Sequence, residues 1–196
     1  LESIAWLTSQ GIVAAIGHSD ADADTARAAI DAGAKVVTHF TNAMAKMVGG
    51  QSMATEVLDD SDISLELIND GTHVPVDVIE ALKKNALDRT ILVTDAMSAA
   101  GSTDGAYKIA NLEVIVKDGV ARLASNGSLA GSTLTMAKAF SHALNEIGIS
   151  ITEAVHAAST LPALILGRSD LGEIAVGKSG YLNHLAKNGE ITPIKC

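Results

Sequence analysis

The chain has 196 residues, of which 47% are hydrophobic, and a formal net charge of -9 from 14 basic and 23 acidic side chains. This length is sufficient for one well-filled core. The acidic balance and the scarcity of aromatic residues argue against a nucleic-acid partner. No apolar run reaches the roughly 20 residues that cross a bilayer, and the single Cys196 allows no internal disulfide. We therefore expect a cytoplasmic protein that acts on small molecules and has no membrane partner.

The first half of the chain alternates apolar strands with helices. It reads as strand, helix, strand, helix, strand, helix, strand, which is typical of βαβ units and a parallel sheet. Gly33 supplies a stop for the first helix, and Pro75 lies near the first turn of a later one. The predicted strands are 11–17, 35–38, 63–68 and 90–94, and the helices with assigned limits are 20–32 and 75–86.

The second half has a different pattern. A loop of small residues at 98–105 precedes two β-rich stretches within 106–124, which surround the hairpin signal Asp118-Gly119. Helical patterns follow at 132–147 and 152–166, with Ser132 and Thr152 as expected N-caps. Residues 171–196 read as short strands and turns.

Polar residues follow the ends of the predicted parallel strands. His18, His39, His73 and Asp95 each lie just beyond an apolar run. In a parallel α/β barrel this face carries the active site. His18 and His39 are about one strand-helix unit apart, so they fall on neighbouring strand ends, and imidazoles suit Zn²⁺, Fe²⁺ or Co²⁺. The alternative is that each is an ordinary capped or surface histidine.

Asp95 is a carboxylate at the mouth of a buried strand. Such a group is costly unless it is paired or functional, and here it could move a proton between a metal-activated water and a leaving group. The alternative is that it caps the following segment. His73 follows Asp70-Gly71-Thr72, so it is either a substrate contact or an ordinary turn residue.

Other candidates are weaker by spacing alone. Asn42 follows the second strand, and 129–132 precedes a helix whose free N–H groups could meet an oxygen-rich ligand or could merely begin the helix. Asp20, Asp22 and Asp24 are expected to form a solvated helix start, because a calcium loop requires a Gly and a Glu that are missing here. Three further histidines are expected to be structural: His142, His156 and His184.

Taken together, these stretches resemble the C-terminal half of the N-acetylglucosamine-6-phosphate deacetylases, a family of the amidohydrolase superfamily. The resemblance rests on motif order over nearly the whole chain. The matching motifs are Gly17-His18-Ser19, Val37-Thr38-His39-Phe40-Thr41-Asn42-Ala43-Met44, Asn69-Asp70-Gly71-Thr72-His73, Leu92-Val93-Thr94-Asp95-Ala96 and the run from Leu129 to Met136.

The resemblance implies a fold, a reaction and a set of site residues. The fold is the C-terminal part of a metal-dependent-hydrolase TIM barrel over 1–168, with a β-hairpin insertion at about 106–124 and a β-rich piece of a small β-sandwich domain at 169–196. The reaction is hydrolysis of the acetamide of N-acetylglucosamine 6-phosphate to glucosamine 6-phosphate and acetate. The implied roles are metal binding for His18 and His39, acid-base catalysis for Asp95, and sugar-phosphate contacts for Asn42, Ala43, Asp70, Gly71, Thr72, His73, Leu129, Ala130 and Gly131.

Two departures from the family pattern matter. The family has an upstream metal-binding Glu and a carbonyl-polarising His that this sequence lacks, so we expect a fragment that is inactive alone. The resemblance also implies a homodimer for the full-length protein. The family also has an Arg after the Asn-Ala-Met motif, whereas 45–51 contains only Lys46 as a cation. The alternatives are therefore a different acylated amino sugar or amide, or a non-catalytic remnant of the fold.

Overall fold

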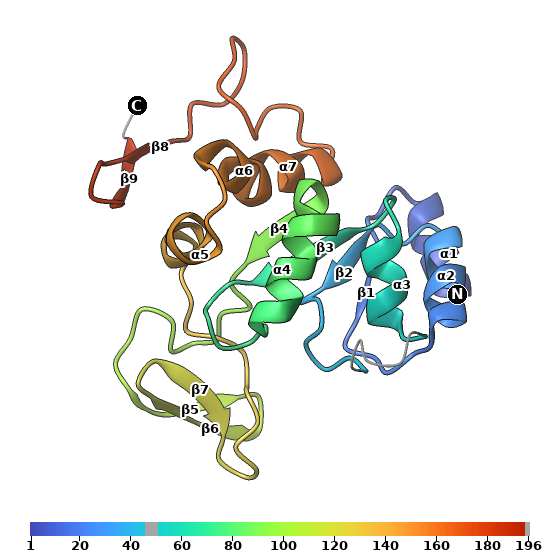
Figure 1. Ribbon diagram of the computed structural model, residues 1–196, viewed down its shortest axis with the longest axis horizontal. Coiled ribbons are helices and arrows are strands. Elements are labelled where there is room, and N and C mark those ends of the chain that lie inside the picture. The colour runs from blue at the N-terminus through green and yellow to red at the C-terminus, as the bar shows by residue number, and fades with distance from the viewer. Residues whose placement is uncertain (46–50, 195–196) are drawn as a thin grey trace.

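The computed structural model describes residues 1–45 and 51–194, and a four-stranded parallel sheet lies at its centre (Figure 1). Neighbouring strands in the chain are also neighbours in the sheet, and each pair is parallel. This arrangement confirms the predicted βαβ pattern. The strands are β1 (Ala15–Gly17), β2 (Val36–Thr38), β3 (Ser64–Ile68) and β4 (Thr90–Val93).

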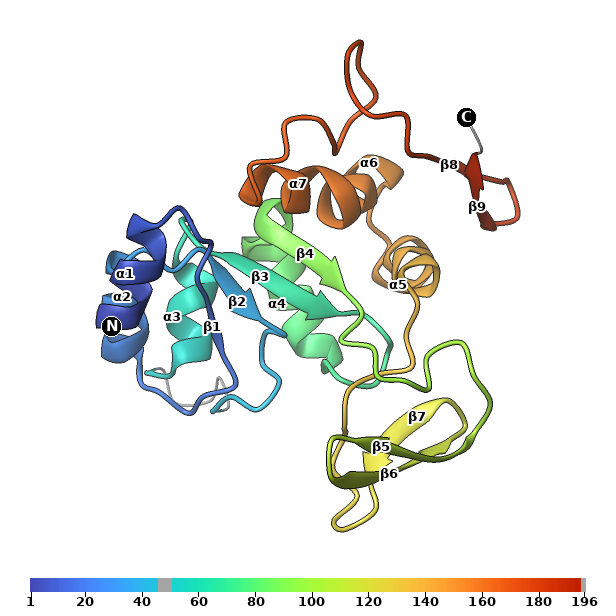
Figure 2. The ribbon, with the colours of Figure 1, turned by 180° about the vertical axis from the view of Figure 1, so that it is seen from behind.

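The helices that connect the strands cover one face of this sheet. In the view from behind, the strands lie in front of α3 and α4 (Figure 2). Val37, Leu65 and Leu67 point into the main core on the helical side, whereas Val36 and Ile91 belong to a separate cluster, as the two-residue period of a strand requires. The helices are α1 (Glu2–Ser9), α2 (Ala23–Asp31), α3 (Met53–Asp59) and α4 (Val76–Asn85), followed by a 3₁₀ turn at Leu87–Arg89.

The ends of the early elements differ by a few residues from the prediction. The first strand covers 15–17 rather than 11–17. The first predicted helix begins at Ala23 because the Asp22 carboxylate accepts the N–H of Thr25 at 2.9 Å and so serves as N-cap. Pro75 occupies the N-cap position of α4 and so lies beside its first turn, as predicted.

A second sheet follows β4 in the chain. It contains β5 (Gly105–Ile109), β6 (Leu112–Lys117) and β7 (Val120–Leu123) in antiparallel order around its own small core. The predicted turn at Asp118-Gly119 is confirmed. The expectation of a single hairpin is wrong, because a second tight turn with Ala110 at φ 50° divides the first β-rich stretch into two strands.

The last third of the chain contains broken helices and a distant hairpin. Two predicted N-caps are wrong: Thr135 rather than Ser132 caps α5, and Ser150 rather than Thr152 caps α6. Ser150 forms a reciprocal capping box with Glu153. The elements are α5 (Met136–His142), α6 (Ile151–Val155) and α7 (Leu161–Ile165), π-helical turns at Ala143–Ile147 and His156–Thr160, and the antiparallel pair β8 (Leu182–Leu185) and β9 (Ile191–Ile194). No helix in the described ranges has the length and apolarity to span a membrane.

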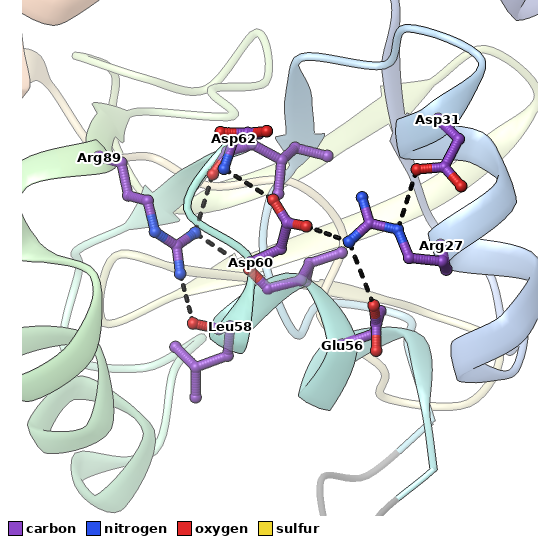
Figure 3. Close-up of polar contacts among 9 residues, drawn as sticks. Arg27, Asp31, Glu56, Leu58, Asp60, Asp62 and Arg89 are labelled. Carbon is purple, nitrogen blue, oxygen red and sulfur yellow. Dashed lines mark hydrogen bonds and ion pairs between the residues drawn. The ribbon is translucent and has the colours of Figure 1, made fainter.

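A buried arginine connects α3 to the strands that follow it (Figure 3). The Arg89 side chain donates to the carbonyls of Val57 at 3.0 Å and Ile63 at 2.8 Å, and also to that of Leu58. Arg89 is only 8% exposed. Its guanidinium therefore satisfies carbonyl groups at the end of α3 that have left the helical ladder.

We predict that Arg89→Met lowers the free energy of unfolding by about 1–3 kcal/mol, because Met has a similar length but leaves buried carbonyls unpaired. Urea unfolding measures the loss. Arg122→Met is the matched control, since Arg122 is exposed and donates to a single surface carbonyl, that of Gly127. Equal losses in the two variants would contradict this role for Arg89.

Candidate active site

Three of the candidate residues lie just beyond the ends of three strands of the parallel sheet. His18 follows β1, His39 follows β2, and Asp95 lies two residues after the end of β4. All three have left-handed backbone, with φ of 50°, 34° and 47°. Residues other than Gly pay about 1–3 kcal/mol for such conformations, which cluster at functional sites. The described residues Thr41, Ala43, Ala110 and Asp118 share this backbone, so what distinguishes the three candidates is its position at the ends of strands of one parallel sheet.

The two histidines lie against each other. His18 Nδ1 is 3.4 Å from His39 Nε2, and the rings meet edge to face with centroids 5.3 Å apart. Two nitrogens on one tetrahedral Zn²⁺, each at about 2.0–2.1 Å, lie about 3.3–3.4 Å apart. The pair therefore fits two positions in the coordination shell of a single ion.

Gly17 allows this close approach. A Cβ at Gly17 would lie 2.8 Å from the carbonyl oxygen of Thr38, closer than real contacts allow. The ends of β1 and β2 can therefore come together only with glycine at this position. His18 and His39 follow directly from this contact.

A cavity of about 390 Å³ opens beside His39 and includes Asp95 in its wall. Within residues 1–45 and 51–194, no three His, Cys, Asp or Glu side chains are close enough to hold one ion. Asp95 therefore shares the cavity with His39 but does not complete a three-donor set. The lining residues are Thr38, His39, Glu66, Leu92, Val93, Thr94, Asp95 and Met136.

Glu66 in this wall was not predicted as a site residue. It lies in the middle of β3 between Leu65 and Leu67, which are buried. Its Oε2 accepts the backbone N–H of His39 at 3.2 Å. A charged residue inside an apolar strand was the available signal, since an ionised group is costly there without a partner.

The loop after β3 holds His73 in a fixed orientation. Asp70 Oδ1 accepts the N–H groups of Thr72 and His73 at 2.8 and 2.9 Å, and Asp70 Oδ2 lies 2.7 Å from His73 Nδ1. The His73 side chain is 2% exposed. Gly71, at φ 75°, provides the left-handed turn. The loop is thus a tight turn whose hydrogen bonds also fix the orientation of the His73 imidazole, and a substrate contact by His73 stays a prediction.

Unpaired buried nitrogens occur on two candidate residues. In the part of the chain that the structure describes, the buried side-chain polar atoms without a hydrogen-bond partner are His39 Nδ1 and His73 Nε2. Such orphaned atoms are rare in folded proteins and indicate a missing water, ion or ligand. Both point to binding at this edge of the sheet.

The segment after His39 forms a second strained loop. Asn42 donates its N–H to the carbonyl of His39 at 2.8 Å, and Thr41 and Ala43 have φ of 66° and 51°. Asn42 and Ala43 are therefore placed directly beside the histidine pair. Lys46, the only cation in the stretch where the family has an Arg, lies outside the described residues.

The segment 129–132 does not begin a helix, so its predicted placement is wrong. Ala130 donates its N–H to Ala121, and Ser132 donates its N–H to the carbonyl of Asp95 at 2.8 Å. The Ser132 hydroxyl also donates to the carbonyl of Thr94. Leu129, Ala130 and Gly131 therefore connect the second sheet to the strand end that carries Asp95.

Two of the remaining histidines contact backbone carbonyls. His142 Nδ1 lies 3.2 Å from the oxygen of Asn69, and His156 Nε2 lies 2.8 Å from that of Asp88. These contacts agree with a structural role. His184 is exposed on β8, and Asp20 and Asp24 are exposed around the α2 cap, as expected of a solvated helix start.

Comparison with known proteins places this chain in a class. A sequence model of the Amidohydrolase family matches residues 9–194. The chain therefore belongs to the Amidohydrolase family, whose members are generally metal-dependent.

Individual relatives and a solved structure give a more specific comparison than the family model. The chain is 39% identical to an N-acetylgalactosamine-6-phosphate deacetylase of Escherichia coli O157:H7, over 91% of this chain and 48% of that protein. It is 36% identical to an N-acetylglucosamine-6-phosphate deacetylase of Vibrio furnissii, over 91% and 45% respectively. The solved N-acetylglucosamine-6-phosphate deacetylase of Mycobacterium smegmatis, bound to that sugar phosphate, superposes with a TM-score of 0.92 at 37% identity, over 99% of this chain and 52% of that one. The chain thus spans about half the length of the relatives it matches.

The Asp70 carboxylate makes stability depend on pH. Burial would raise its pKa, but the hydrogen bonds from His73 and Thr72 outweigh burial and hold the pKa below its ordinary value. A depressed folded-state pKa contributes stability above the unfolded-state value of about 3.9, and this contribution is lost as pH falls through the folded-state pKa. We predict that Asp70→Asn is less stable than wild type at pH 7 and that this difference shrinks below about pH 4. A difference independent of pH in urea titrations would contradict the assignment.

Proposed function

We propose that the protein containing this chain is a metal-dependent hydrolase of the acetamide in N-acetylglucosamine 6-phosphate, which yields glucosamine 6-phosphate and acetate in cytoplasmic amino-sugar breakdown. The observation that carries the proposal is the His18–His39 pair at strained strand ends beside a cavity that also contains Asp95. The family match over nearly the whole chain supports the same chemistry.

His18 and His39 are the proposed holders of a divalent cation, Zn²⁺, Fe²⁺ or Co²⁺. A bound cation would supply Lewis-acid activation of water and of the acetyl carbonyl. Catalytic zinc sites have three protein ligands, so a third would come from outside the described residues. In this proposal, residues 1–168 form part of a TIM barrel, residues 169–196 belong to a small β-sandwich domain, and the full-length protein is a homodimer.

Asp95 is the proposed acid-base residue. The oxygen of an attacking water forms a bond to the acetyl carbon while Asp95 accepts the proton of that water. The bond from carbon to the amide nitrogen then breaks, and Asp95 returns the proton to the departing amine. Hydrogen bonds from Ser132 to the backbone carbonyls of Thr94 and Asp95 secure the strand end that carries this carboxylate.

The sugar phosphate is proposed to bind around the same edge. The Nε2 of His73 is buried and has no hydrogen-bond partner. The contact of Asp70 with Nδ1 sets the tautomer of the ring. Gly71 and Thr72 share its loop, Asn42 and Ala43 lie beside His39, and Leu129, Ala130 and Gly131 approach Asp95. A Cβ at Gly131 would lie 3.1 Å from the backbone carbonyl oxygen of Asp95, and Gly131 has φ 60°, so glycine suits this close approach.

A second candidate substrate is the galactose epimer, N-acetylgalactosamine 6-phosphate, because relatives with that name match this chain as well as those named for glucose. The two sugars differ only at the C4 hydroxyl, so the chemistry at the amide is the same. Only the groups that contact the sugar ring would discriminate between them.

Acetate release from a panel of substrates tests the function. With the natural full-length protein and added Zn²⁺ or Co²⁺, we expect turnover of one or both 6-phosphate epimers in preference to unphosphorylated N-acetylglucosamine. A preference for the unphosphorylated sugar or another amide would favour a different amidohydrolase. No turnover of any of them would favour a non-catalytic fold.

We predict that Asp95→Asn lowers kcat by about 10²–10⁴-fold, the usual contribution of a positioned acid-base group. Asn tolerates left-handed backbone well, so thermal unfolding should change little. Exposed Asp104→Asn serves as a control outside the cavity lining. A kcat within twofold of wild type would remove Asp95 from the proposed proton transfer.

A further inference from the structure

Glu66 contacts two successive residues at the end of β2. Its Oε2 accepts the N–H of His39 at 3.2 Å, and its backbone carbonyl accepts the N–H of Phe40 at 2.7 Å. In an extended strand, successive N–H groups point to opposite sides. Here both point to the same residue of β3, because His39 has left the extended conformation at φ 34°.

Phe40 fixes the other side of this turn. It is 1% exposed and lies in the main hydrophobic core. The chain therefore leaves β2 at Thr38, turns at His39 and enters the core at Phe40. Without the Glu66 carboxylate, the His39 N–H would lose its acceptor at the cavity wall. The extended backbone conformation of His39 would then have the lower free energy.

The conformation of His39 decides where its imidazole points. In the observed state its Nε2 lies 3.4 Å from His18 Nδ1. Glu66 itself belongs to no three-donor metal cluster among the residues described. Its effect on the histidine pair is therefore exerted through the backbone of His39 rather than by contact with an ion.

We infer that Glu66 is a positioning residue, which holds His39 in its left-handed conformation and so keeps the imidazole facing His18. The inference rests on the proposed function only for its consequence, the binding of a divalent cation by that pair. Hydrogen-bond partners of this kind outside the coordination shell typically change metal affinity by about 10–100-fold.

Two substitutions separate hydrogen bonding from charge. Glu66→Gln keeps a carbonyl acceptor of the same length and removes the negative charge, whereas Glu66→Leu removes both. Glu113→Leu is the matched control, since Glu113 is an exposed strand residue on β6 in the second sheet. Each variant is compared with wild type by NMR of the metal-free protein and by calorimetric titration with Zn²⁺.

In the metal-free protein, we expect Glu66→Leu to speed amide exchange at His39 and to shift its Cα resonance toward extended values. Zn²⁺ affinity should fall by about 10–100-fold. Glu66→Gln should stay within a few-fold of wild type, and Glu113→Leu should change neither measurement.

The inference is overturned if Glu66→Leu leaves the His39 resonances and exchange unchanged, or if Glu66→Gln loses as much affinity as Glu66→Leu, which would indicate a charge effect. The metal-free NMR keeps this outcome separate from the proposed function. If wild type binds no Zn²⁺ while the His39 changes still occur, the metal site fails and the positioning role stands.

Discussion

The parallel alignment of four short strands is the constraint on which the rest of the molecule depends. Because the strands run the same way in the order β1-β2-β3-β4, the residues that follow them are delivered to one edge of the sheet. His18 and His39 are 21 positions apart in the chain but 3.4 Å apart in space for this reason. An alternating antiparallel sheet would have placed them at opposite ends.

At that edge the backbone is held in costly conformations by specific contacts. The described non-glycine residues with left-handed backbone include His18, His39, Thr41, Ala43 and Asp95, and the remaining two lie in turns of the second sheet. The Glu66 carboxylate accepts the N–H of His39, and Ser132 donates its N–H to the carbonyl of Asp95 at the end of β4. Strain at these positions is thus offset by hydrogen bonds from neighbouring residues.

Much of this could be predicted from sequence because it rests on short-range patterns. Apolar runs gave the strands of the parallel sheet, and polar residues at their ends indicated His18, His39, His73 and Asp95. Long-range contacts were not predictable in this way. Nothing local distinguishes Ser132, whose N–H binds the carbonyl of Asp95, from a helix N-cap. The tight turn at Ala110 lacks the usual Gly or Asn at that position. Glu66 could have been noticed as a charge in an apolar strand, but its partner could not.

The central claim is that His18 and His39 bind one ion at the edge that also carries Asp95. Anomalous diffraction from crystals of the full-length protein soaked in Zn²⁺ tests it most directly. The account predicts a single strong peak within about 2.0–2.1 Å of one nitrogen of each imidazole, facing the cavity that Asp95 lines. A peak elsewhere, with both imidazoles unligated, would contradict it.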